Sequence, residues 1–183
     1  MAPPPSDPLD DLLERVWRRQ PACGRTRVIA IDGPSGAGKT TLAAQLASRS
    51  GASTLHLEDL YRGWHGLETG PAAAARILQA VATDAIAREP RWDWELDMPG
   101  ADLVVAPASL LIVEGVGAGA TVMSPYVNAL VWLDGDEAGR KRRALGRDGD
   151  VYAPWWHVWA AQERVHFARE GTAARAELHL TLR

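Results

Sequence analysis

The sequence predicts an α/β fold in which an open parallel sheet carries helices on both faces. Short β-branched apolar runs, typical of buried strands, alternate along the chain with longer segments of helical periodicity. A glycine-rich turn also joins the first such run to the helical segment that follows it. The chain has 183 residues, 46% of them hydrophobic and 23% charged, which suits one globular domain. In this fold class ligands bind at the carboxyl ends of the strands, so we expect the site in the loops after the strands.

Residues 1–24 are expected to form a loose proline-rich segment followed by an amphipathic helix. Asp7 can cap this helix, Pro8 suits its first turn, and acidic residues precede arginines, as the helix dipole favours. An apolar stripe at helical spacing comprises Leu9, Leu12, Leu13, Val16 and Trp17. The stripe could cover this domain or a neighbouring copy, and we expect it to pack on its own domain.

The rest of the chain, residues 25–183, is expected to form the principal domain. Apolar runs predict strands at residues 26–32, 53–59, 109–115, 128–135 and 176–182. Helical periodicity predicts helices at residues 39–51, 71–89, 136–148 and 156–171.

Composition narrows the functional classes. A formal net charge of −3 gives no reason to expect a nucleic-acid partner. The single cysteine, Cys23, excludes an internal disulfide framework and suits a reducing cytoplasm. No apolar run approaches the ~20 residues that span a bilayer, and the N-terminus lacks the pattern of a secretory signal. We expect a cytoplasmic protein with neither nucleic-acid nor membrane partners, and the oligomeric state stays open.

The glycine-rich turn is the most specific motif in the sequence. It matches G-x-x-x-x-G-K-[ST] between a predicted strand and a predicted helix, so its backbone N–H groups can surround phosphate oxygens. Lys39 supplies the cation for the β- and γ-phosphates, and the Thr40 hydroxyl is an expected Mg²⁺ ligand. Asp32, just before the turn, is expected to orient its backbone. The predicted nucleotide-binding residues are Gly33, Pro34, Ser35, Gly36, Ala37, Gly38, Lys39, Thr40 and Thr41.

Other motifs separate the classes of protein that use such a loop. The guanine-reading N-K-x-D of translation-type GTPases is absent, and "DMPG" at residues 97–100 matches D-x-x-G only weakly. The L-S-G-G-Q signature is also absent, and the chain is short for a motor ATPase. These observations favour the small-molecule kinases.

Five further segments resemble the uridine kinases and nicotinamide riboside kinases, a family of P-loop small-molecule kinases. "HLEDLYRG" is similar to their D-x-F-Y-R and D-D-F-F segments, "EPRWDWELD" to P-x-Y-D-F, and "LLIVEGVGAG" to V-x-x-E-G. "LDGDEAGRKRRALGRD" resembles the strand and R-x-x-R-R-x-x-R-D helix that carry the family's lid, and "VYAPWWHVWAAQE" resembles an aromatic segment of the riboside kinases. The pieces keep the family's order over residues 27–165. The resemblance implies a P-loop NTPase fold, ATP and Mg²⁺ as cofactors, and an arginine-bearing lid at about residues 136–160.

Carboxylates at two predicted strand ends are candidates for catalysis and metal binding. A kinase needs a carboxylate that orients the acceptor hydroxyl and takes its proton, and Glu58 or Asp59 could act in this way. Counted back from Tyr61, Glu58 falls where the family has its catalytic aspartate, although Asp59 remains an alternative. By the same resemblance, Glu114 would hold Mg²⁺ beside Thr40.

The predicted lid helix places Arg140, Arg143 and Arg147 on one face. An arginine on such a face can neutralise charge that develops on the transferred phosphoryl group. We expect Arg143 or Arg147 to act in this way, together with Lys39.

The acceptor site is the least defined part of the prediction. Tyr61, Trp64, Trp92, Asp93 and Trp94 are candidate substrate residues because aromatic faces stack on bases and sugars, although core packing is the alternative for any one tryptophan. The family's F-D-H-P segment, whose aspartate grips ribose, is missing here. We expect an ATP-dependent transfer of the γ-phosphate to a hydroxyl of a small molecule, with a nucleoside as the first candidate acceptor. Alternatives are a sugar, a vitamin, a nucleoside monophosphate or a non-catalytic role as an ATP sensor.

Overall fold

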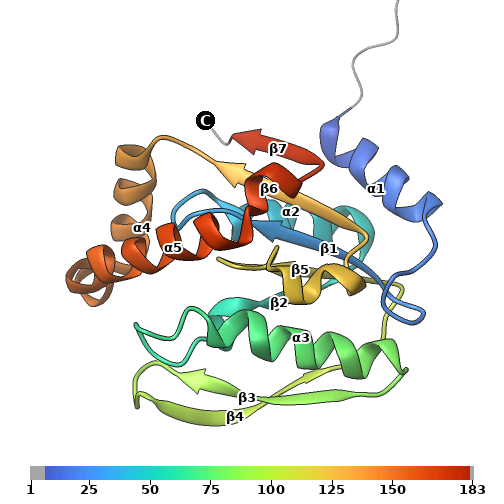
Figure 1. Ribbon diagram of the computed structural model, residues 1–183, viewed down its shortest axis with the longest axis horizontal. Helices are drawn as coiled ribbons and strands as arrows, with labels where there is room; N and C mark the ends of the chain where they lie inside the picture. The colour runs from blue at the N-terminus through green and yellow to red at the C-terminus, as the bar shows by residue number, and fades with distance from the viewer. Residues whose placement is uncertain (1–6, 182–183) are drawn as a thin grey trace, which may run out of the picture.

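A five-stranded parallel sheet forms the centre of the molecule (Figure 1). The computed structural model describes residues 7–181 except the side chain of Asp148, so the predicted loose segment lies mostly outside the described residues. The strands in spatial order are β2 (Ser53–His56), β5 (Leu110–Glu114), β1 (Arg27–Asp32), β6 (Ala129–Asp134) and β7 (Leu178–Thr181). This arrangement confirms the predicted α/β class.

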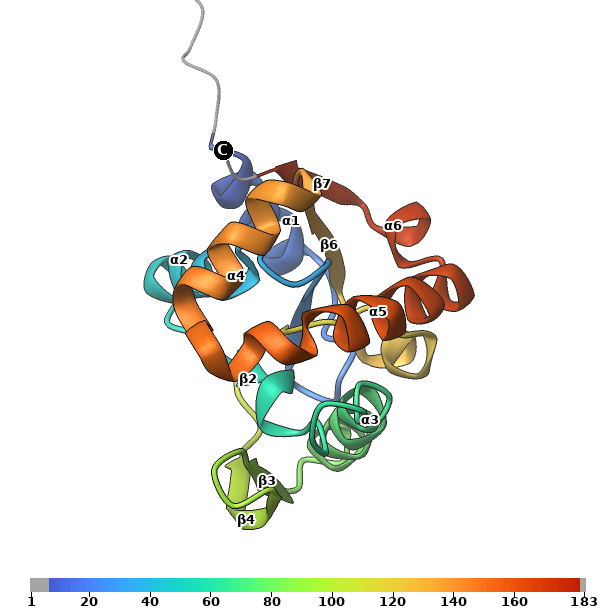
Figure 2. The ribbon, with the colours of Figure 1, turned by 90° about the vertical axis from the view of Figure 1, so that its left-hand side faces the viewer.

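Alternate side chains of β1 enter two separate hydrophobic cores. Ile29 and Ile31 pack with α1 (Pro8–Arg18) and α2 (Lys39–Ser50). Val28 and Ala30 pack on the other face with α3 (Thr69–Ala82) and with the first turns of α5 (Trp156–Glu170). The helices therefore cover both faces of the sheet, as an end-on view shows (Figure 2).

The N-terminal helix packs on its own domain. The Asp7 carboxylate accepts a hydrogen bond of 2.8 Å from the backbone N–H of Leu9, which caps the first turn. Leu12 and Val16 are fully buried against the sheet core. Trp17 departs from the predicted stripe, because it is 41% exposed and stacks against the guanidinium of Arg27.

The structure corrects two predicted boundaries. The helix predicted at residues 71–89 ends at Ala82, since Asp84 takes a left-handed conformation at φ 63° and breaks the helical path. The chain then forms an antiparallel hairpin, β3 (Ala87–Asp93) and β4 (Met98–Val105), that packs along α3 (Figure 1). The strand predicted at residues 53–59 ends at His56 and continues as a 3-10 turn, η1 (Leu57–Asp59).

The remaining elements are helices and 3-10 turns that come after β5 in the chain. Helix α4 (Glu137–Tyr152), which contains most of the predicted lid, is interrupted at Gly149, whose φ of 56° and ψ of −138° are not helical. It is followed by the 3-10 turn η3 (Ala153–Trp155) and by α5. Two short elements complete the fold, the 3-10 turn η2 (Thr121–Tyr126) and α6 (Thr172–Arg175). Over the described residues, no helix has the length and apolar character needed to span a membrane.

Candidate active site

The glycine loop begins where β1 ends at a buried carboxylate. Asp32 is fully buried and accepts backbone N–H groups from Gly33 (2.7 Å), Gly117 (2.8 Å) and Gly119 (2.9 Å). These bonds tie the start of the loop to the turn after β5. Asp32 thus holds loop backbone, as the sequence predicted.

Close packing of backbone against backbone requires glycine in the loop itself. A Cβ atom on Gly33 would lie 1.9 Å from the carbonyl oxygen of Leu133, and one on Gly36 would lie 2.1 Å from that of Arg140. Gly36 also has φ 75°, in the left-handed region. Glycine therefore lets the loop pass close to β6 at Gly33 and close to α4 at Gly36.

Lys39 folds back across the loop. Its Nζ donates to the carbonyl oxygens of Gly33 (2.8 Å) and Pro34 (3.1 Å), and the side chain is buried. Burial lowers the pKa of Lys39, and the nearby carboxylates of Glu114 and Glu163 oppose that shift. The amine thus lies within the loop whose N–H groups are suited to phosphate oxygens.

Glu114 and Thr40 bring two oxygen donors together at the end of β5. The Thr40 hydroxyl donates to Glu114 Oε1 at 3.1 Å. Burial acts to raise the pKa of Glu114, but the hydrogen bond from His56 and the charge of Lys39 outweigh it and lower the pKa overall. A hydroxyl beside an ionised carboxylate is the hard-oxygen donor set that Mg²⁺ prefers, so these residues fit the predicted metal.

His56 is a residue of this cluster that sequence reasoning missed. Its Nδ1 lies 2.6 Å from Glu114 Oε1, and this hydrogen bond raises the pKa of His56. His56 ends β2 directly beside Glu114 in the parallel register. The sequence did not reveal this contact, because the predicted strand continued to residue 59 and the pairing of β2 with β5 follows only from the structure.

A cavity of about 600 Å³ opens between the glycine loop and helices α4 and α5. Its walls come from the loop, η1 and the residues after it, the end of β5, α4 and α5. The lining residues are Ser35, Gly36, Gly38, Lys39, Thr40, Thr41, Glu58, Tyr61, Trp64, Trp94, Glu114, Gly115, Val116, Arg143, Ala144, Arg147, Val151, Tyr152 and Trp159.

The two candidate acids after β2 point to different places. Glu58 is exposed and lines the cavity. The carboxylate of Asp59 instead lies 3.3 Å from Nε of Arg91 on the β3–β4 hairpin. Asp59 is therefore tied to the hairpin and lies outside the cavity wall.

The arginines of the predicted lid divide their contacts between the loop and the cavity. Arg143 Nε donates to the carbonyl oxygen of Gly36 at 2.8 Å, and Arg140 Nη1 donates to that of Ser35 at 3.1 Å. Arg143 and Arg147 line the cavity, and Arg140 does not. The helix thus rests on the glycine loop and directs two cations into the space beside it.

Aromatic side chains form part of the cavity lining, and we call them the aromatic wall: Tyr61, Trp64, Trp94, Tyr152 and Trp159. Trp64 stacks with Tyr152 at a ring separation of 5.2 Å and with Trp155 at 5.9 Å. The ring centroids of Trp94 and Trp64 lie 4.9 Å apart. Nε1 of Trp94 donates to the carbonyl oxygen of Glu58 at 3.1 Å. Tyr61 is buried and donates its hydroxyl to the carbonyl oxygen of Val116 at 2.9 Å.

Two candidate substrate residues lie away from the cavity. The Asp93 carboxylate accepts the N–H groups of Glu95 and Leu96 and so closes the hairpin turn. Trp92 is half-buried near Gly63 and does not line the cavity. Tyr152 and Trp159, which the sequence analysis did not single out as site residues, line it instead.

Comparisons with known proteins support the same class of fold. A profile of the cytidylate kinase family matches residues 29–83, which include the glycine loop and Glu58. A structure described as a possible uridine kinase from Bacillus stearothermophilus superposes with a TM-score of 0.64 at 20% identity, covering 94% of this chain and 96% of the other. A proposed fructose transport system kinase from Silicibacter sp. TM1040 gives a TM-score of 0.61 at 21% identity, covering 93% of each chain. No curated protein matched the chain.

The comparisons show that the chain shares the fold of these kinase structures. The protein has a kinase-like P-loop fold and resembles the uridine kinases, as the sequence predicted.

Proposed function

We propose that the protein is an ATP-dependent phosphotransferase that moves the γ-phosphate to a hydroxyl of a small molecule, with a nucleoside as the first candidate. One observation carries the proposal. Lys39, Thr40, Glu114, Arg143 and Glu58 all line a single cavity of about 600 Å³. A phosphate-binding loop, a metal-binding pair, a lid arginine and a carboxylate on the acceptor side are the groups that phosphoryl transfer to an alcohol requires.

The donor side of the cavity would hold Mg·ATP. The loop N–H groups and Lys39 would bind the β- and γ-phosphates, which would draw the lysine away from the carbonyl oxygens that it now contacts. Thr40 and Glu114 would hold Mg²⁺, which neutralises phosphate charge when bound. The carboxylate of Glu114 is kept ionised for this role by His56 and Lys39.

Glu58 would act on the acceptor side. Its carboxylate would orient the acceptor hydroxyl and accept its proton as the hydroxyl oxygen bonds to the γ-phosphorus. The bond from that phosphorus to the β–γ bridging oxygen breaks, and ADP leaves with the electron pair. Arg143 and Arg147 would neutralise the charge on the phosphoryl group in transit. We place Asp59 in a supporting role, because Arg91 engages its carboxylate.

The aromatic wall supports a flat acceptor. Trp64 and Trp94 line the cavity, and aromatic side chains bind bases and sugars through ring contacts. A nucleoside offers both a ring for this wall and a primary hydroxyl for Glu58. A sugar is the second candidate, favoured by the likeness to a proposed fructose transport system kinase.

The test is a survey of candidate acceptors, in a buffer that resembles the cytoplasm because we infer a cytoplasmic location for the protein. Purified protein is incubated with Mg·ATP or Mg·GTP and with nucleosides, sugars, vitamins or nucleoside monophosphates, and phosphorylated products are identified by mass spectrometry. The proposal expects one acceptor class to give product, with turnover lost in Glu58→Gln. ATP binding without product from any acceptor would contradict the kinase proposal and favour an ATP sensor.

A further inference from the structure

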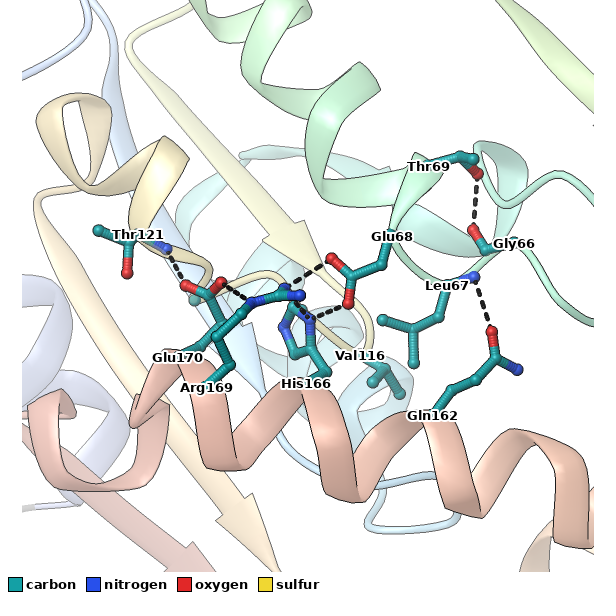
Figure 3. A network of polar contacts seen from close by, with 12 residues as sticks. Gly66, Leu67, Glu68, Thr69, Val116, Thr121, Gln162, His166, Arg169 and Glu170 are labelled. Atoms are coloured by element: carbon teal, nitrogen blue, oxygen red, sulfur yellow. Dashed lines mark hydrogen bonds and ion pairs between the residues drawn. The ribbon is translucent and has the colours of Figure 1, made fainter.

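Helix α5 runs between the donor loop and the aromatic wall and contacts both. One side of the helix presents Gln162, His166 and Arg169, spaced four and three residues apart, toward the segment 64–69 (Figure 3). Its neighbour Glu163 faces the glycine loop instead. Two adjacent residues therefore reach two different walls of the cavity.

Glu163 fixes the donor loop through its backbone. The side chain is 5% exposed, and Oε1 accepts the N–H of Ser35 at 2.8 Å. Arg140 of α4 holds the carbonyl oxygen of the same residue at 3.1 Å. Both backbone polar groups of Ser35 are thus held by side chains of the two helices that close the cavity. A carboxylate buried this deeply is costly unless it is hydrogen-bonded, so this contact is a specific one.

Gln162 fixes the aromatic wall in the same way. Its Nε2 donates to the carbonyl oxygen of Trp64 at 2.8 Å, and its Oε1 lies 3.5 Å from the N–H of Leu67. The next turns of α5 extend this anchor. His166 Nδ1 lies 2.9 Å from Glu68 Oε1, and Arg169 Nη2 donates to Glu68 Oε2 at 2.6 Å (Figure 3). The segment that carries Trp64 is therefore attached to α5 at three successive points.

We propose that α5 sets the spacing between phosphate donor and acceptor, with Glu163 and Gln162 as positioning residues for the two sides. The proposal rests on the proposed kinase function. A helix is stiff on the scale of one residue, so adjacent anchors keep the loop of Ser35 and the ring of Trp64 at a fixed separation. Phosphoryl transfer depends chiefly on such positioning. Neither residue lines the cavity, so each would act through the backbone that it holds.

The proposal predicts that the two neighbours control different constants. Glu163→Met removes the acceptor oxygen at nearly constant volume, and we expect the Kd for Mg·ADP, measured by calorimetry, to rise about 10-fold. Gln162→Met should raise the KM for the best acceptor of the survey, beginning with uridine, about fivefold. Glu163→Met should leave the acceptor KM within about twofold of wild type, and Gln162→Met should leave the Kd for Mg·ADP within about twofold. Glu163→Gln keeps an acceptor oxygen for Ser35, so its Kd should stay within about threefold of wild type.

Controls separate positioning from general loss of structure. Arg164→Met changes an exposed residue of the same helix and should alter neither constant. Backbone amide hydrogen exchange should become faster in residues 64–68 for Gln162→Met and in residues 33–36 for Glu163→Met. Neither variant should change the exchange rate in the other segment. Parallel changes in both constants, no change in either, or a Glu163→Gln variant as weak as Glu163→Met would overturn the proposal.

The exchange and Mg·ADP measurements need no turnover. They therefore test the role of α5 even if no acceptor is phosphorylated. Failure of the kinase proposal and failure of the spacing proposal are in this way distinguishable.

Discussion

The donor side and the acceptor side of the cavity differ in the chemical groups that form them. The donor side is mostly backbone: a loop of consecutive residues between β1 and α2, whose glycines pack closely against other backbone and whose start is held by the carboxylate of Asp32. The acceptor side is mostly side chains: Trp64, Trp94, Tyr152 and Trp159 come from four separate segments. A site formed by closely packed backbone tolerates few substitutions. A site formed by side chains can change its specificity when one aromatic residue is replaced by another. We therefore expect variants on the donor side to abolish function and variants on the acceptor side to tune it.

The largest effect is expected at Lys39 on the donor side. Lys39→Met should lower kcat about 10³-fold, because the cation for the transferred phosphate is lost. Thermal unfolding should show a lower melting temperature than wild type, since the variant leaves the buried carboxylates of Asp32 and Glu114 without this cation. Activity within tenfold of wild type would break the assignment of this side to the donor.

Glu58 should give the next largest effect. Glu58→Gln should lower kcat by about 10² to 10³-fold and leave the Kd for Mg·ATP unchanged, because only proton acceptance is lost. The matched variant Asp59→Asn should change kcat less than about threefold, since its carboxylate lies outside the cavity wall and its partly exposed ion pair with Arg91 contributes at most about 1 kcal/mol. A reversed order of the two variants in steady-state kinetics would assign the catalytic role to Asp59.

Trp64 should produce a smaller, selective effect on the acceptor side. Trp64→Ala should raise the acceptor KM about 10-fold and leave the KM for ATP unchanged, because an aromatic side chain that lines the acceptor side is removed. Trp92→Phe provides a control tryptophan outside the cavity wall and should keep both constants. An equal loss in both constants for Trp64→Ala would show that the two sides are not separable.

The smallest effect is expected at Glu170, which anchors α5 away from both sides. Its carboxylate accepts the N–H of Thr121 and the guanidinium of Arg169, which lower its pKa to about 2 despite partial burial (Figure 3). The folded pKa lies below the unfolded one, so this stabilisation is present above about pH 4.5 and is lost as the pH falls toward 2. We expect about 1 kcal/mol at pH 7, because Arg169 is 52% exposed and screened by solvent.

Denaturant unfolding of Glu170→Gln at pH 7 and at pH 3 measures this contribution. The variant should be less stable than wild type at pH 7 and closer to it at pH 3. A difference that grows on acidification would contradict the assigned pKa. Kinetic constants at pH 7 should not change.

The same contrast explains which parts were predictable from sequence. The P-loop was readable because its geometry lies within consecutive residues, and the sheet was readable because its strands are continuous apolar runs. The β3–β4 hairpin was missed since it is largely exposed and its first strand contains Pro90, so neither strand shows a buried alternation. The alanine-rich pattern before it favoured extending α3 past its true end.

The division between Glu58 and Asp59 depended on tertiary structure. Arg91, which engages Asp59, reaches it from a hairpin that sequence patterns did not reveal. Glu163 ends a segment that the sequence analysis noted, but its contact was not predicted, because 128 residues separate it from Ser35 along the chain. Contacts of this kind follow from the packing of α5 on the sheet and have no local signature.

The stacked rings give the molecule an optical property. Trp64 lies nearly parallel to Tyr152 and Trp155, at interplanar angles of 13° and 5°, and forms part of the cavity wall. Closely spaced indole transitions couple, so this cluster should dominate the near-ultraviolet circular dichroism of the protein. A compound that enters beside Trp64 changes the surroundings of that coupled chromophore. The protein therefore carries a built-in spectroscopic probe of acceptor occupancy that needs neither a label nor turnover.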